Sequence, residues 1–227
     1  MTTKNFDQEY NRKRAANTHF NYRLRRRTDE VIRAIYKHHP LSTGFILDIG
    51  AADGLMLSRI KKKFPKAKCV GLEYSLELIA ANKDRGIKII HGDAHNLPFP
   101  DNSFDIAIAS AVIEHMERPE KMLREARRVL KKEGILIVTT AVPFFEKIAR
   151  IIGHLKNDEL LKGEQHHTMF NIRKLKEYFR EGGFRILQTD KFLISPVGLP
   201  AEIKIEKLIK FFRLDFVLLN QLIVGRK

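Results

Sequence analysis

The sequence is poor in the residues on which secreted, zinc-binding and membrane-spanning proteins depend. It contains no tryptophan and a single cysteine, Cys69, among its 227 residues. One cysteine excludes an internal disulfide and a zinc site built on several thiolates, and within its apolar run Cys69 is expected to be a buried structural thiol. No apolar run approaches the roughly 20 residues of a membrane-spanning helix, and the basic N-terminus lacks the apolar core of a signal peptide. We therefore expect a cytoplasmic protein.

Acidic residues are also scarce relative to basic ones. Lysine and arginine number 42 against 27 aspartates and glutamates, which gives a formal net charge of +15. Residues 1–40 hold ten of the basic residues and four of the acidic ones. A positive field attracts RNA, an anionic membrane surface or a phosphorylated substrate, although a solvated basic face explains the same composition. The charge leaves open whether this basic N-terminal segment contacts RNA or the surface of a membrane.

Short apolar runs alternate with amphipathic segments along most of the chain. The apolar runs predict strands, at residues 45–49, 69–73, 87–91, 104–109, 134–140, 184–187 and 219–224. The segments between them predict helices at 55–64, 76–83, 120–130 and 172–180. Such alternation is typical of a doubly wound α/β fold, in which helices cover both faces of a mostly parallel sheet. With 44% hydrophobic residues, the chain suits one such domain.

The first predicted strand ends in a small-residue loop. Its apolar run reaches Asp48, and Gly50, Ala52 and Gly54 follow at alternate positions before the first helix. A strand, a tight loop and a helix N-terminus together form a site for a nucleotide-like ligand. The spacing differs from the G-x-G-x-x-G of dinucleotide-binding proteins, and no Gly-Lys-Ser/Thr follows to make a phosphate-binding loop.

Acids end the next two predicted strands as well. Ligands bind beyond the carboxyl ends of the strands in such sheets, so Glu73 and Asp93 are expected beside the loop after Asp48. A carboxylate can accept hydrogen bonds from vicinal ribose hydroxyls, or from an exocyclic amine such as that of adenine. Ser110 and His115 follow the fourth strand. The loop and the acids together predict a site for a nucleotide-like ligand at this edge of the sheet.

The run from Gly92 to His115 (GDAHNLPFPDNSFDIAIASAVIEH) closely resembles the ubiquinone/menaquinone-biosynthesis-like branch of the class I S-adenosylmethionine-dependent methyltransferases. The run from Glu125 to Leu136 (EARRVLKKEGIL) is similar to the family's following helix and turn. The resemblance covers residues 45–140 and continues more weakly to the last strand. It implies a Rossmann-like sheet of seven strands with an antiparallel last strand, S-adenosylmethionine as the cofactor, and methyl transfer.

The resemblance also implies roles for individual residues. The cofactor-binding positions are Asp48, Gly50, Ala51, Ala52, Gly54, Glu73, Tyr74, Asp93, Ala94 and Ser110. The loop and Asp48 would hold the methionine portion, Glu73 the ribose hydroxyls and Asp93 the adenine amine. The family usually has glycine where Ala52 stands. If this position requires a positive φ, alanine costs on the order of 1 kcal/mol there.

A methyl group on a sulfonium is already activated, so the protein mainly aligns the acceptor and excludes water. A general base is needed only where the acceptor must lose a proton. The candidates are His115, His166 and His167, with Tyr22 and Glu164 as weaker ones. Packing or helix capping explains the histidines equally well. No metal site is expected, since adjacent histidines point in different directions.

Two segments, residues 143–165 and 195–216, do not fit the strand–helix alternation. Both are amphipathic: in the second, Ile205, Leu208 and Phe212 share a helical face opposite several lysines. We expect these insertions and the helical N-terminal segment to cover the acceptor site. Their apolar faces would then line a pocket for a lipophilic or aromatic acceptor or touch a membrane, although packing on the sheet or on a second subunit is an equal alternative.

The expected function is methyl transfer to a small, lipophilic or aromatic acceptor. Methylation of RNA is an alternative favoured by the charge, but no Asn/Asp-Pro-Pro-Tyr signature follows the fourth strand and no appended RNA-binding module is recognisable. A non-catalytic protein that binds S-adenosylmethionine is a second alternative, motivated by Ala52. The loop spacing and Asp93 speak against a nicotinamide dehydrogenase. The acceptor, the methylated atom and the oligomeric state are not predicted.

Overall fold

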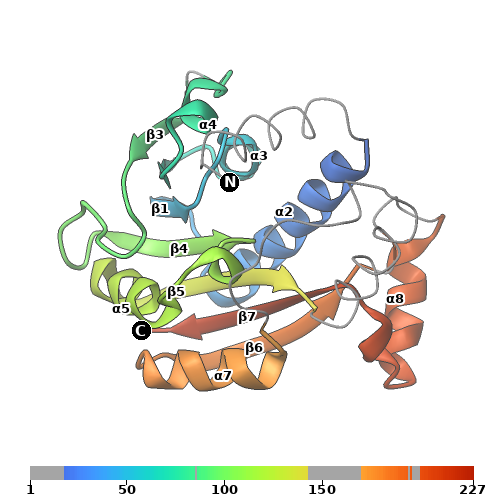
Figure 1. The fold of residues 1–227 in the computed structure, drawn as a ribbon. Helices are drawn as coiled ribbons and strands as arrows, with labels where there is room; N and C mark the ends of the chain where they lie inside the picture. Colours follow the sequence, from blue (N-terminus) through green and yellow to red (C-terminus); the bar gives the residue numbers. More distant parts are fainter. Residues whose placement is uncertain (1–17, 85, 143–169, 194, 196–199) are drawn as a thin grey trace.

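A computed structural model describes residues 18–84, 86–142, 170–193, 195 and 200–227 (Figure 1). Seven strands form one sheet in the order β3-β2-β1-β4-β5-β7-β6. Their bounds are β1 Gly44–Ile49, β2 Ala67–Glu73, β3 Lys88–His91, β4 Phe104–Ser110, β5 Leu130–Ala141, β6 Arg185–Phe192 and β7 Asn220–Arg226. The first five strands are mutually parallel, and β7 runs antiparallel to both β5 and β6. The predicted doubly wound sheet with an antiparallel last strand is confirmed.

The helices cover both faces of this sheet. Their bounds are α2 Thr18–His38, α3 Leu55–Lys63, α4 Leu76–Ala80, α5 Pro119–Val129, α7 Ile172–Glu181 and α8 Glu202–Phe211, with 3₁₀ turns η1 Ile113–His115 and η2 Asp215–Val217. Strand β4 shows how the core divides. Its Ile106 and Ile108 belong to the apolar cluster that contains α2 and α3, whereas Ala107 and Ala109 belong to the cluster that contains α5 and α7. Alternate residues of a strand point to opposite faces, so both faces of β4 are buried.

Most predicted boundaries are close to the observed ones, and one helix ends early for a local reason. The predicted helix at 76–83 ends at Ala80. The side chain of Asn82 accepts a hydrogen bond from the backbone N–H of Asp84 at 2.9 Å and donates one to the carbonyl of Ile87 at 2.9 Å. These side-chain bonds replace helical backbone bonds. The predicted insertion at 143–165 lies outside the described residues, as do residues 1–17 of the basic N-terminal segment.

The second insertion does contain a helix, α8, and among the alternatives for its apolar face, packing on the sheet is not the one observed. The apolar face of Ile205, Leu208 and Phe212 is exposed, and the helix instead buries Glu202 and Glu206. Partners on α2 and on the chain after β6 satisfy these carboxylates, which makes their burial tolerable. None of the helices that the structure describes is long and apolar enough to span a bilayer.

Candidate functional site

The loop between β1 and α3 has a left-handed backbone at three positions. Gly50, Ala52 and Gly54 have φ angles of 74°, 50° and 76°. At Gly50 a side chain is also excluded by space, because a Cβ atom would lie 2.3 Å from Cγ2 of Val112. Ala52 therefore meets the condition for backbone strain, a positive φ at this position. An alanine held in this conformation costs about 1 kcal/mol or more relative to glycine, so neighbouring contacts must stabilise the loop.

Glu73, the buried last residue of β2, provides those contacts. Its Oε2 atom accepts a hydrogen bond from the backbone N–H of Ala52 at 2.8 Å. Its Oε1 atom accepts from the backbone N–H groups of Tyr74 and Ser75 at 2.8 and 2.9 Å. A carboxylate has about four acceptor positions, so Glu73 retains capacity on Oε2 for one further donor. The acid therefore stabilises the loop and can still accept a hydroxyl of a ligand.

Gly71 is a contributor to this loop that the sequence reasoning missed. The backbone N–H groups of Gly50 and Ala51 both donate to the carbonyl of Leu72, at 2.8 and 2.9 Å. A Cβ atom on Gly71 would lie 2.6 Å from the Cβ atom of Ala51. The loop can therefore reach β2 only because residue 71 has no side chain. A glycine inside a predicted strand is the signal that could have identified it.

Asp93 lies beyond the end of β3, half-exposed, and is held by His95. Its Oδ1 atom accepts from the backbone N–H and from the ring Nδ1 of His95, both at 2.8 Å. Burial opposes ionisation of the Asp93 carboxyl, but the two bonds from His95 outweigh it and hold its pKa below the usual value. Asp93 is thus a carboxylate at neutral pH and a suitable acceptor for an amine. His95 is a second residue that the sequence reasoning did not identify.

The ends of β1 and β4 complete this edge of the sheet. Asp48 is buried at the end of β1, and Ser110 ends β4. The hydroxyl of Ser110 lies 2.7 Å from that of Thr139 on β5, a buried partner that the sequence did not indicate. Ala94, after β3, is also buried, while Tyr74 is exposed with its ring centroid 6.0 Å from that of His91. Asp48, the loop, Glu73, Asp93 and Ser110 all stand at carboxyl ends of parallel strands.

The structure describes some of the residues proposed as general bases and not others. His115 is half-buried in η1, directly after β4. His166, His167 and Glu164 lie outside the described residues. Tyr22 donates a hydrogen bond to Glu202, and burial followed by this bond raises the pKa of Tyr22 to about 12. A phenol with this pKa carries its proton at neutral pH, so Tyr22 is a poor general base.

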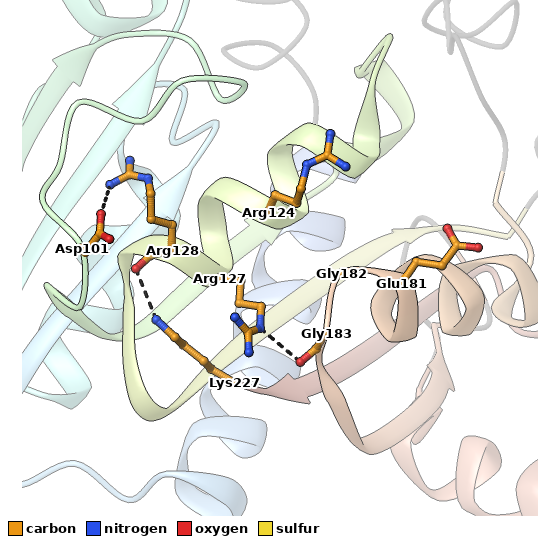
Figure 2. A pocket seen from close by; sticks show the side chains of 8 residues that line it. All are labelled: Asp101, Arg124, Arg127, Arg128, Glu181, Gly182, Gly183 and Lys227. Atoms are coloured by element: carbon orange, nitrogen blue, oxygen red, sulfur yellow. Dashed lines mark hydrogen bonds and ion pairs between the residues drawn. The ribbon is translucent and has the colours of Figure 1, made fainter.

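A cavity of about 480 Å³ lies elsewhere, between the C-terminal ends of α5 and α7 (Figure 2). Its lining includes Arg124, Arg127 and Lys227. The Arg127 Nε donates to the carbonyl of Gly183 at 3.2 Å, and the Lys227 Nζ donates to the carbonyl of Arg128 at 3.3 Å. The cavity adjoins the start of β4 rather than its end, so it is separate from the strand-end site.

The chain has recognisable relatives over its central part. Residues 47–138 match a family model described as a methyltransferase domain. A demethylmenaquinone methyltransferase from Thermotoga maritima is 35% identical over 100 residues, which are 43% of this chain and 44% of that protein. A second one, from Corynebacterium kroppenstedtii, is 34% identical over 107 residues, 45% of this chain and 46% of that protein. The chain thus spans about half the length of the curated relatives it matches.

Solved structures show the same fold over nearly the whole chain. An S-adenosylmethionine-dependent methyltransferase from Thermotoga maritima superposes with a TM-score of 0.67 at 24% identity, covering 98% of this chain and 96% of that one. Another, from Mesorhizobium loti, gives a TM-score of 0.63 at 21% identity, covering 94% and 99%. The strand-end residues from Asp48 to Ser110 fall within residues 47–138, which match the family model, whereas α2 and α8 lie outside those residues.

Proposed function

We propose that this chain methylates a small, lipophilic or aromatic acceptor. Through residues 47–138 it belongs to the class I S-adenosylmethionine-dependent methyltransferases. The observation that carries the proposal is the geometry of Glu73. This residue fixes the strained loop at Ala52 and keeps one acceptor position available. A buried carboxylate is tolerated only when it accepts hydrogen bonds, and the remaining acceptor position of Glu73 suits a ligand hydroxyl. The acceptor class rests on the similarity to the quinone methyltransferases.

The residues present suit the cofactor, which supplies a methyl group activated on a sulfonium. Glu73 would accept a hydrogen bond from a ribose hydroxyl, and Asp93 would accept one from the adenine amine. The left-handed backbone at Gly50, Ala52 and Gly54 carries no bulky side chain, so the methionine portion could approach the loop closely beside Asp48. Ser110, at the end of β4, would lie beside the methionine tail.

The remaining positions have supporting roles in this proposal. Ala51 contacts β2 through its backbone and thereby fixes the loop. The backbone N–H of Ala94 would contact a ring nitrogen of adenine, and the exposed ring of Tyr74 offers an apolar surface next to the ribose. The protein's contribution to the reaction would then be alignment of the acceptor and exclusion of water. His115, His166 and His167 stay predictions for a base, to be used only where the acceptor must lose a proton.

Methylation of RNA is the second candidate, and the observation that favours it is the net charge of +15. The two candidate functions differ in the molecule that receives the methyl group, a small apolar compound in one and RNA in the other. A basic protein that binds RNA through phosphate contacts loses affinity steeply as salt rises. A small apolar acceptor would show little dependence on salt. Salt dependence therefore separates the two acceptor classes.

Calorimetry followed by an acceptor assay tests the proposal. We expect S-adenosylmethionine and S-adenosylhomocysteine to bind with one site per chain. With a methyl-labelled donor, we expect label in demethylmenaquinol and none in bulk tRNA. Absence of binding of either compound would favour the non-catalytic alternative and contradict the proposal. Label found only in tRNA, with binding lost at high salt, would establish the second candidate instead.

A further inference from the structure

The exposed apolar side chains are concentrated in one short stretch of the chain. Seven of the eleven large hydrophobic residues that are exposed in the described part of the chain lie between residues 203 and 216. They are Ile203, Ile205, Leu208, Phe211, Phe212, Leu214 and Phe216. Single exposed apolar residues need no explanation, but a contiguous group marks a surface that binds a partner or a membrane. We refer to these seven residues as the α8 apolar surface.

Helix α8 is held with this surface outward by its buried acids. Glu206 accepts two hydrogen bonds from Nη2 of Arg26 on α2, at 2.7 and 2.9 Å, and one from the backbone N–H of Leu193 at 2.9 Å. Glu202 accepts from the hydroxyl of Tyr22. Both glutamates are only 4% exposed. Rotating the helix to bury its apolar side would leave these charges unpaired, so the exposure is built into the packing.

Basic residues border the α8 apolar surface. Lys204, Lys207 and Arg213 are exposed in and just after α8, between the apolar residues. The aromatic rings are the most protruding part: Phe211 is 78% exposed and stacks edge-on against Phe212 at a centroid distance of 5.2 Å. Apolar side chains flanked by lysine and arginine are typical of helices that lie at the interface of an anionic bilayer.

The surface also lies at the edge of the sheet where the strand-end site is found. Strands β5 and β6 are both antiparallel to β7, so they point in the same direction. Helix α8 follows the end of β6, and in Figure 1 the arrowheads of β4, β5 and β6 point toward it. A bilayer against α8 would therefore face the carboxyl edge of the sheet, from which a lipophilic acceptor could enter.

We propose that the α8 apolar surface docks the protein on an anionic lipid bilayer, with its phenylalanines inserted below the headgroups and Lys204 and Lys207 against the phosphates. A second copy fits less well. A two-fold contact between copies would bring the same exposed cations on both chains together, and like charges repel. An anionic bilayer offers an apolar layer and negative charge in the same place. The proposal does not depend on the proposed reaction, since docking is measured without methyl transfer.

Sedimentation with vesicles tests the docking. The full chain is mixed with vesicles of phosphatidylcholine alone, or of equal parts phosphatidylcholine and phosphatidylglycerol. We expect binding to the anionic vesicles, weakened at high salt. The double variant Phe211→Ser/Phe212→Ser should bind roughly tenfold or more weakly, because two apolar side chains no longer enter the bilayer. Lys204→Gln/Lys207→Gln should lose roughly tenfold or more, because each adjacent cation contributes about 1 kcal/mol.

The control is Leu76→Ser, which removes an exposed apolar side chain from α4, outside the α8 apolar surface. We expect this variant to bind vesicles like the wild type. Equal binding by the phenylalanine variant and the wild type would overturn the proposal. The proposal would also be overturned if the wild type did not bind vesicles and formed a concentration-dependent dimer that the phenylalanine variant abolished. A lowered melting temperature of the phenylalanine variant, again without vesicle binding, would show that protein covers the surface and would also overturn it.

Discussion

The loop at residues 50–54 and the contact between α2 and α8 both depend on buried carboxylates, yet the partners differ. In the loop, Glu73 accepts from three backbone N–H groups, the most distant of which is 21 positions away. In the helix contact, Arg26 and Glu206 meet side chain to side chain across 180 positions. A backbone donor is present at every residue except proline, whereas the donor to Glu206 depends on the side chain at position 26. Substitutions should therefore affect stability mainly at the helix contact and ligand binding mainly at the loop.

The largest effect is expected from Arg26→Met. This variant leaves the carboxylate of Glu206 buried without its guanidinium partner, and breaking a buried pair in this way costs about 3–5 kcal/mol. Urea unfolding measures the loss. Arg25→Met changes an exposed arginine on the same helix and should lie close to the wild type. Equal destabilisation by the two variants would mean that the pair between α2 and α8 is unimportant. Adding Glu206→Leu to Arg26→Met should recover most of the stability.

Removal of the Glu73 carboxylate should have the next largest effect, on binding rather than on folding. Glu73→Ala deletes the acceptor for the ribose hydroxyl and for the N–H of Ala52. Hydrogen bonds to a charged group contribute about 1.5–3 kcal/mol each, so affinity for S-adenosylhomocysteine should fall about 10- to 100-fold or more while the fold persists. Calorimetry measures the affinity and circular dichroism the fold. Glu77→Ala, on α4, is the matched control, and unchanged affinity in Glu73→Ala would exclude the ribose role.

A smaller effect, a gain in stability instead of a loss, is expected from a substitution within the loop. Ala52→Gly removes the strain of a left-handed alanine and should stabilise the protein by about 1 kcal/mol. Ala51→Gly, whose backbone φ is not positive, should instead destabilise it slightly, because glycine adds freedom to the unfolded chain. Unfolding midpoints in urea compare the two. If both variants shift the midpoint in the same direction, the loop is not strained at residue 52.

The smallest effect expected is that the strand-end site, at Asp93, and the contact between α2 and α8 lose stability at opposite ends of the pH range. His95 holds the pKa of Asp93 below its usual value, so that contribution to stability is present above the usual value and is lost as pH falls through the lowered one. Burial raises the pKa of Tyr22 from 10 to about 12, so its contribution is present below pH 10 and is lost as pH rises through about 12.

Two measurements check this pH dependence. The stability difference between the wild type and Asp93→Asn should shrink on acidification. The difference in tyrosinate absorbance between the wild type and Tyr22→Phe should titrate near pH 12. A difference that titrates near pH 10 instead would show that Tyr22 is not engaged with Glu202 in solution.

The sequence predicted one half of the molecule much better than the other. The strands from β1 to β3, the loop and the positions of Glu73 and Asp93 follow from apolar runs that end in acids or glycines, which are local signals. The supporting residues His95 and Thr139 were missed because each is recognised only by the neighbour that it contacts. Gly71 was missed although a glycine inside a predicted strand is a local signal. Of the three histidines predicted as candidate bases, His115, His166 and His167, only His115 lies in the described part of the chain.

Helix α8 marks the limit of what periodicity can predict. The spacing of Ile205, Leu208 and Phe212 correctly placed them on one face, but it could not say whether that face points inward. That choice was made by Arg26 and Tyr22, whose side chains pair with the glutamates of α8 from a helix far away in the sequence. The sequence by itself determined the sheet, the loop and the acids at the strand ends, because these depend on local backbone geometry and burial. Only the tertiary structure decided which residues α8 exposes, because desolvated charges must find partners and no local pattern records where those partners are.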